Sequence, residues 1–142
     1  MAGSFRAALE TAAAEVEDVH GGALEVVVVG DATLDDRLAA LVQASREAMV
    51  NAAKYAGDAG PVQVFGEVEP ERATVFVRDR GPGFDPAAVP DDRLGLRQSV
   101  IGRMERAGGT AEVVTEPGKG VEVRLAVPLD GVAGRRAKEE AT

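Results

Sequence analysis

The sequence has 142 residues, the length of one ordinary domain, and its formal net charge of −8 argues against a surface that binds nucleic acid or an anionic membrane. It has no cysteine, which excludes disulfides and thiolate metal sites, and its single histidine excludes a metal site built on two histidines. Hydrophobic residues make up 45% of the chain and aromatic residues only 4%, so we expect an aliphatic core.

The first part of the chain has the pattern of a helix, a strand and a longer helix. Residues 4–19 are rich in alanine and have apolar residues every three or four positions, which predicts an amphipathic helix. Residues 24–29 form a β-branched run typical of a strand. A long helix is then expected from Asp35 or Thr33 to Ala56, where a glycine follows.

The rest of the chain is predicted to contain two pairs of strands, separated by an irregular segment and one more helix. The expected elements are strands 62–68 and 73–79, an irregular segment 80–94, a helix 95–107, and strands 110–115 and 121–127. Helices and strands are grouped rather than strictly alternating. This order favours a two-layer α/β (α+β) sandwich, in which a mixed, mostly antiparallel sheet has its helices packed on one face.

One face of the predicted long helix carries a row of polar residues. Asn51 and Lys54 follow Glu47 by four and seven positions, which places all three on one side of a helix. An asparagine oxygen suits Mg²⁺, a lysine supplies positive charge for a phosphate, and a glutamate can accept a proton. Taken alone, such a row is also common on a solvated helix face.

A glycine-rich segment follows the second strand of the predicted hairpin. Asp79, Gly81, Gly83 and Phe84 have the form D-x-G-x-G-F. A carboxylate at a strand end can accept a hydrogen bond from an exocyclic amine such as that of adenine, and glycines let a flat ring approach the backbone. A plain glycine turn is the alternative for this segment alone, but its combination with the polar helix row favours a nucleotide site.

These motifs resemble those of the ATP-binding catalytic (HATPase_c) domain of bacterial sensor histidine kinases, in the GHKL superfamily of gyrase, chaperone, histidine-kinase and mismatch-repair ATPases. The stretch REAMVNAAKYA is similar to the N box of this family, and RDRGPGF is similar to its G1 box. The stretch LGLRQSVIGRMERAGGTAEVVTEPGKG is similar to its G2 region, last helix and final glycine turn. The likeness covers residues 24–129 and is strongest to actinobacterial kinases paired with NarL/LuxR-like response regulators.

The resemblance implies ATP and Mg²⁺ as cofactors and assigns a role to each motif residue. Glu47 and Lys54 are expected to be catalytic, with Glu47 near the transferred phosphoryl group, and Asn51 is expected to bind Mg²⁺. Asp79 is expected to accept a hydrogen bond from the adenine amine. The implied nucleotide-binding residues are Asn51, Lys54, Tyr55, Asp79, Gly81, Gly83, Phe84, Arg93, Gly95, Leu96 and Thr110.

The region after the G1 box departs from the family pattern. Residues 85–94 are expected to form a lid over the nucleotide, and Gly95 is expected to begin the next helix. Only one glycine stands before that helix where the family has a pair, so Arg93 or Arg97 is expected to contribute charge toward the phosphates.

The final glycine turn also departs from the family pattern. Val121 follows this turn where the family has a threonine that supports the adenine-binding carboxylate. Thr110 or Thr115 is expected to supply the missing hydroxyl.

The sole histidine, His20, stands at the end of the first predicted helix, where interaction with the helix dipole or with solvent explains it better than a phosphoacceptor role. Residues 1–22 are therefore interpreted as a helix that either links to a separate dimerisation and phosphoacceptor domain or belongs to the sandwich. Residues 23–129 are interpreted as the ATP-binding domain, and residues 130–142 as a flexible tail.

The sequence thus predicts the Mg-ATP-binding catalytic domain of a two-component sensor histidine kinase, which donates the γ-phosphate to a histidine on a separate domain. Its expected partners are the histidine-containing dimerisation domain of the same kinase and a response regulator, with no nucleic acid and no direct membrane contact. No apolar run reaches the ~20 residues of a membrane-spanning helix, and no secretory signal is evident, so a cytoplasmic location is expected even for a membrane-anchored parent. The alternatives are an anti-sigma-factor-type serine kinase and a degenerate nucleotide-binding docking module.

Overall fold

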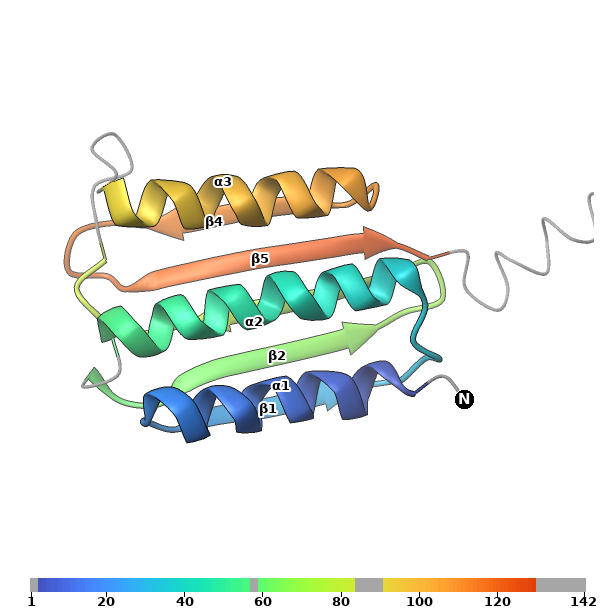
Figure 1. Ribbon diagram of the computed structural model, residues 1–142, viewed down its shortest axis with the longest axis horizontal. Helices are drawn as coiled ribbons and strands as arrows, with labels where there is room; N and C mark the ends of the chain where they lie inside the picture. Colours follow the sequence, from blue (N-terminus) through green and yellow to red (C-terminus); the bar gives the residue numbers. More distant parts are fainter. Residues whose placement is uncertain (1–2, 57–58, 84–90, 130–142) are drawn as a thin grey trace, which may run out of the picture.

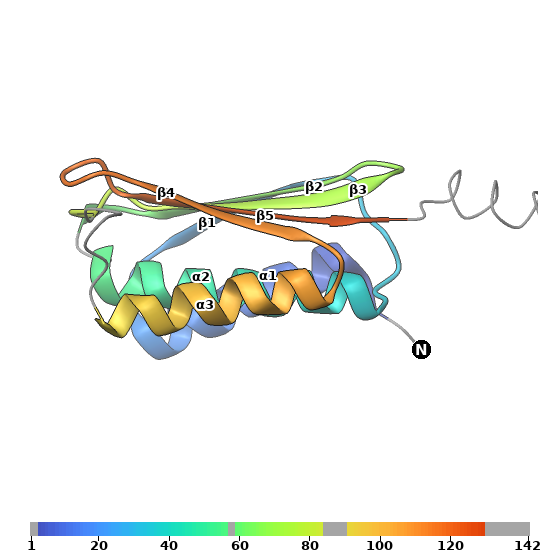
Figure 2. The ribbon, with the colours of Figure 1, turned by 90° about the horizontal axis from the view of Figure 1, so that it is seen from above.

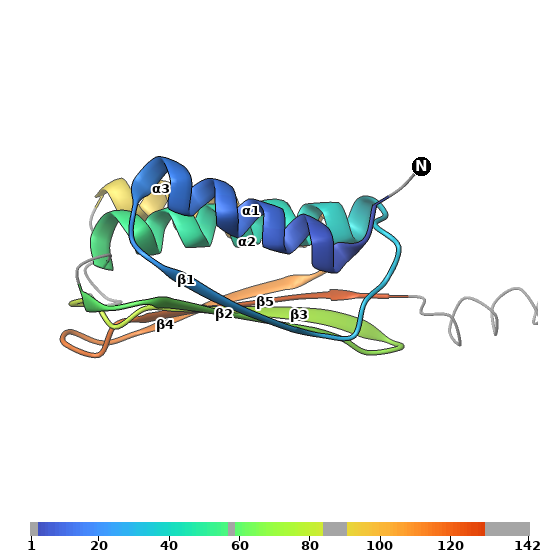
Figure 3. The same ribbon diagram turned by 90° about the horizontal axis from the view of Figure 1, so that it is seen from below.

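In the described part of the chain, three helices lie on one face of a five-stranded sheet (Figure 1). The computed structural model describes residues 3–56, 59–83 and 91–129, without the side chains of residues 56 and 91–97. The helices are α1 (Phe5–His20), α2 (Asp36–Ala56) and α3 (Asp91–Arg106). The strands are β1 (Leu24–Val29), β2 (Val62–Val68), β3 (Arg72–Arg78), β4 (Thr110–Thr115) and β5 (Val121–Pro128). Seen from above and from below, all three helices are on the same side of the sheet (Figures 2 and 3).

The strand order in the sheet is β1-β2-β3-β5-β4. β1 is parallel to β2, and the other neighbouring strands are antiparallel. Strands β2 and β3 form the expected hairpin, closed by a hydrogen bond of 2.8 Å from the backbone N–H of Glu69 to the carbonyl oxygen of Arg72. The predicted sandwich, with a mixed, mostly antiparallel sheet and its helices on one face, is therefore confirmed.

Side-chain caps decide where the first two helices begin. Ser4 Oγ accepts a hydrogen bond of 3.1 Å from the backbone N–H of Ala7 at the start of α1. Asp35 Oδ1 accepts one of 2.9 Å from the N–H of Leu38 at the start of α2. Each bond satisfies a donor that has no partner inside the helix. Asp35, rather than Thr33, is thus the residue that caps the long helix.

The third helix begins at Asp91, so the prediction that it begins at Gly95 is wrong. Two aspartates stand in its first turn, where the helix dipole favours negative charge, and a glycine inside a helix costs only about 1 kcal/mol. The last residues of the expected lid are therefore helical. Within the described ranges, no helix combines the length and the apolar content needed to cross a bilayer.

Helix α1 shares one hydrophobic core with the sheet and α2. Phe5 and Leu9 are both fully buried. The absence of a side chain at Gly66 on β2 makes room for them, because a Cβ there would lie 3.0 Å from Leu9 Cδ2 and 3.6 Å from Phe5 Cε2. The other large, fully buried side chains of the described residues are Leu, Met and Val, so the expected aliphatic core is confirmed with Phe5 as its one large aromatic member.

Replacing Leu9 with alanine tests whether α1 is part of this core in solution. The change removes a fully buried side chain between α1 and β2, and we expect it to lower the free energy of unfolding by about 2–5 kcal/mol. Val19→Ala, on the same helix at a position that is 71% exposed, is the control and is expected to change it by about 0.5 kcal/mol or less. Urea unfolding followed by circular dichroism measures both. Equal stabilities of the two variants would mean that α1 does not pack as described.

Candidate nucleotide site

The direction of the chain brings four segments to one end of the sandwich. The C-terminal end of α2, the end of β3, the β4–β5 turn and the N-terminal end of α3 all lie at the left of Figure 1, and they share one end in the other two views. A backbone hydrogen bond of 2.9 Å from Asp79 to Val121 ties the end of β3 to the start of β5. Two motifs that are far apart in the sequence thus end on the same side of the molecule.

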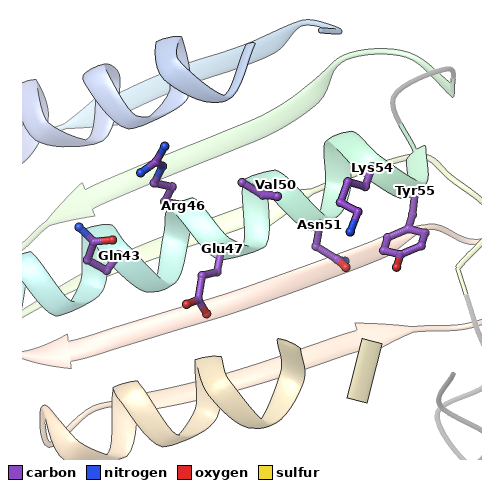
Figure 4. Close-up of a pocket in the computed structure, with 7 residues that line it drawn as sticks. All are labelled: Gln43, Arg46, Glu47, Val50, Asn51, Lys54 and Tyr55. Carbon is purple, nitrogen blue, oxygen red and sulfur yellow. The ribbon is translucent and has the colours of Figure 1, made fainter. Parts of the chain in front are cut away.

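The polar row on α2 lines a pocket of about 320 Å³. Glu47, Asn51 and Lys54 all contribute to it, so the structure brings these three predicted site residues together (Figure 4). Asn51 is only 8% exposed, whereas Lys54 is exposed. The Lys54 ammonium lies 5.6 Å from the centre of the Tyr55 ring, close enough for a cation–π contact. The described residues around the pocket are Gln43, Arg46, Glu47, Val50, Asn51, Lys54 and Tyr55.

The Glu47 carboxylate is held by two residues of α3 that the motif patterns did not indicate. Arg103 Nη2 lies 2.8 Å from Glu47 Oε1, and Ser99 Oγ donates a hydrogen bond of 3.2 Å to Oε2. Glu47 projects from the side of α2 that is nearer to α3 (Figure 4). Ser99 and Arg103 are four positions apart and therefore share a face of α3, but this spacing alone does not indicate that the face contacts Glu47.

The second motif places a buried carboxylate after β3. Asp79 is 5% exposed, and its Oδ1 accepts hydrogen bonds from the backbone N–H of Gly81 at 2.9 Å and of Val121 at 3.2 Å. Backbone donors from two loops thus fix the orientation of this carboxylate. An oriented, buried acceptor is what selective binding of an amine on a flat ring requires.

Glycines let the motif after β3 lie directly against the turn between β4 and β5. Gly83 has a φ of 62°, and a Cβ on it would lie 2.2 Å from the carbonyl oxygen of Glu116. Gly120 has a φ of 76°, and its Cβ would lie 2.2 Å from the carbonyl oxygen of Asp79. The N–H of Gly118 donates to the Pro82 carbonyl oxygen at 2.6 Å. The loop after β3 and the turn between β4 and β5 are therefore in direct backbone contact next to Asp79.

Of the two threonines expected to support Asp79, the structure places only Thr115 nearby. Thr115 is buried, pairs with Val121 across the β4–β5 ladder, and donates through Oγ1 to the Gly120 carbonyl oxygen at 2.8 Å. Thr110 is exposed and pairs with Ala126. Thr110 is the first residue of β4 and Thr115 is the last. Successive strand residues are about 3.3 Å apart, so Thr110 lies at the far end of the strand from Thr115. The structure thus does not bring Thr110 into the site.

The remaining predicted residues are placed only in part. Gly81 is buried, and its φ is not positive. Arg93, Gly95 and Leu96 are in the N-terminal part of α3, at the same end of the sandwich. The side chains of Arg93, Leu96 and Arg97 are outside the described residues. Phe84 and the expected lid residues up to 90 also lie outside the described residues.

Several solved structures have a similar fold. The chain is 24% identical to the histidine kinase domain of the Erythrobacter litoralis EL346 blue-light activated histidine kinase, with a TM-score of 0.70, over 89% of this chain and 61% of that one. It is 21% identical to the mycobacterial sensor histidine kinase MprB, with a TM-score of 0.69, over 90% and 97% of the two chains. For the Acinetobacter baumannii histidine kinase AdeS the identity is 20% and the TM-score 0.69, over 92% and 68%.

These likenesses concern the fold, and the chain spans about three fifths of the Erythrobacter kinase domain. A family model described as "Histidine kinase-, DNA gyrase B-, and HSP90-like ATPase" matches residues 36–131, which is more than half of the chain. This match includes α2, the loop after β3 and the turn between β4 and β5, so it contains both halves of the candidate site. The chain belongs to the family of histidine kinase-, DNA gyrase B- and HSP90-like ATPases.

Proposed function

We propose that this domain binds Mg-ATP and is the catalytic domain of a two-component sensor histidine kinase, donating the γ-phosphate to a histidine on a separate domain. The observation that carries the proposal is that the C-terminal part of the pocket on α2 and the buried Asp79 lie toward the same end of the sandwich. A nucleotide has a ring with amine donors at one end and phosphates at the other. The two halves of the site have the chemistry that matches these two ends.

The residues present fit such a ligand. Asp79 would accept a hydrogen bond from the adenine amine, and Lys54 would stabilise the phosphates as a positive charge. Among the described residues there is no group of three or more His, Cys, Asp or Glu side chains that could hold a metal ion. Mg²⁺ bound to a nucleotide takes most of its ligands from phosphates and water, so the single oxygen of Asn51 suffices for it.

In this proposal the chain positions charge rather than forming covalent bonds with the substrate. Bound Mg-ATP supplies the phosphoryl group, as in phosphoryl transfer generally. Lys54 compensates negative charge on the phosphates, and Glu47 accepts a proton from the attacking group. His20 is in the last turn of α1, where the helix dipole accounts for a basic residue, and we assign the acceptor histidine to a separate dimerisation domain. The proposed next partner in phosphoryl transfer, after the dimerisation domain, is a response regulator of the NarL/LuxR-like type.

Calorimetric titration of the chain with ATP and Mg²⁺ tests the nucleotide part of the proposal. We expect saturable binding, with ATP preferred over GTP. Absence of binding at high protein concentration would favour a docking module without nucleotide. Labelled ATP tests the acceptor: the label is expected on a separate histidine domain and to be lost in acid. An acid-stable phosphoserine on a partner protein would instead support a serine kinase, and stoichiometric label on His20 would contradict the assignment of the acceptor.

Replacing Asn51 with alanine tests the magnesium role. The change removes the one side-chain oxygen that we assign to the metal, so the affinity for ATP measured with Mg²⁺ is expected to fall to the value measured without it. Gln43→Ala is the matched control, because Gln43 is an exposed amide on the same helix and lines the same pocket. Its affinity is expected to keep the magnesium dependence. A magnesium effect that survives Asn51→Ala would show that the metal is held elsewhere.

A further inference from the structure

The pocket on α2 contains a negative charge at a place where an anionic ligand would be repelled. Among the described residues that line it, Glu47 is the only carboxylate; the cations Arg46 and Lys54 also line it, and Arg46 projects from the other side of α2 (Figure 4). Like charges a few ångströms apart repel, and a half-buried pocket screens them less than bulk water does. A residue that compensates Glu47 therefore influences how many negative charges a ligand of this pocket can carry.

Arg103 compensates this charge from the neighbouring helix. Its Nη2 lies 2.8 Å from Glu47 Oε1, and the two side chains are only 34% and 29% exposed. Arg103 Nε is buried and has no hydrogen-bond partner within the described part of the chain, so Glu47 is the charge partner that holds this guanidinium. Arg103 lines a different hollow, with Asp36, Arg37 and Arg106, and in the described part of the chain its contact with the pocket residues is the ion pair with Glu47.

We propose that Arg103 is a positioning residue, which holds and neutralises Glu47 so that the pocket selects ligands with several phosphates. The inference rests on the proposed function, since it requires a nucleotide in this pocket. Without Arg103, the Glu47 carboxylate loses its ion pair and disfavours each added phosphate more strongly. Without Glu47, the Arg103 charge is uncompensated and has the opposite effect. With both removed, the local charge returns to that of the wild type.

A double-mutant cycle tests this charge balance. Dissociation constants for ATP, ADP, AMP and adenosine are measured by calorimetry, at constant Mg²⁺, for the wild type, Arg103→Met, Glu47→Gln and the double variant. Arg103→Met is expected to weaken ATP binding by about three- to tenfold, ADP binding by less, and adenosine binding not at all. Glu47→Gln is expected to strengthen ATP binding by a similar factor. The double variant is expected to return to within about twofold of the wild type.

Arg106→Met is the matched control, because it removes the same charge from an exposed position in the last turn of α3. It is expected to change ATP affinity by less than about twofold, because exposed charges farther away are screened. Equal losses in Arg103→Met and Arg106→Met, a parallel loss of adenosine binding, or no recovery in the double variant would each overturn the inference.

Two further variants test the charge of Arg103 if Arg103→Met does not fold, as judged by circular dichroism. Arg103→Lys, which keeps the charge, is then expected to retain ATP affinity to within about threefold, whereas Arg103→Gln is expected to lose it. If these two variants bind ATP equally well, Arg103 does not act through its charge. A wild-type chain that binds neither ATP nor adenosine contradicts the proposed function instead, so the two failures are distinguishable.

Discussion

Asp79→Asn is expected to lower the affinity for ATP by about ten- to a hundredfold and to narrow the preference for ATP over GTP. In the structure, Oδ1 of Asp79 accepts hydrogen bonds from the N–H groups of Gly81 and Val121. An asparagine keeps these two bonds through its one carbonyl oxygen, which places its amide N–H₂ where the carboxylate has a second oxygen. A donor then meets the adenine amine, which is also a donor. The carbonyl of guanine, in contrast, accepts from an amide.

Calorimetric titration with ATP and with GTP measures both effects. Glu25→Gln is the control, because it makes the same chemical change at an exposed position on β1 and is expected to leave both affinities unchanged. The fold of Asp79→Asn is checked by its thermal unfolding, since both backbone donors keep an acceptor. If its preference for ATP over GTP equals that of the wild type, Asp79 does not contact the base.

Gly120→Ala is expected to lower the free energy of unfolding by about 3 kcal/mol, which corresponds to a melting temperature roughly 10 °C lower for a chain of this size. Two effects add. The φ of 76° is unfavourable for a residue with a Cβ, and that Cβ would lie 2.2 Å from the carbonyl oxygen of Asp79. Because the close neighbour is backbone, the overlap is relieved only if the loop that holds Asp79 moves. ATP affinity is therefore expected to fall as well.

Gly118→Ala separates these two effects. Gly118 is in the same turn with a φ of 79°, but a Cβ there would have no neighbour within 4 Å. We therefore expect only the conformational cost, about 1 kcal/mol, and an unchanged affinity for ATP. Thermal unfolding by calorimetry compares the two variants. If Gly118→Ala and Gly120→Ala are destabilised equally, the turn between β4 and β5 does not contact the loop after β3.

Local patterns were sufficient to predict most of the fold. The alanine-rich periodicity of α1 and the alternating strands of the β2–β3 hairpin depend on residues close together in the sequence, and both elements are found as expected. The start of α3 differs from the prediction: a lone glycine indicates a boundary at Gly95, but the aspartates before it favour a helical first turn, and the helix begins at Asp91. Elements were thus predicted more reliably than their ends.

The candidate site, too, can be predicted from the sequence only in part. The spacing of Glu47, Asn51 and Lys54 by itself predicts that they share a helix face, and the structure places all three in one pocket. Their roles toward Mg²⁺ and phosphate stay predictions, as do those of the residues on α3. Arg103 could not be assigned from the sequence, because it is 56 positions from Glu47 and the contact depends on how α2 and α3 pack.

The succession of helices and strands, the fold class and the two polar motifs can be predicted from local patterns, because helix periodicity, strand alternation and motif spacing are properties of neighbouring residues. Which threonine lies near Asp79, in contrast, depends on how the strands pair. Thr110 and Thr115 are the same type of residue, but they stand at opposite ends of β4, and strand pairing alone brings Thr115 beside Val121. Tertiary structure likewise decided that Gly83 and Gly120 meet another backbone, because contacts between loops depend on strand register, which no single segment specifies.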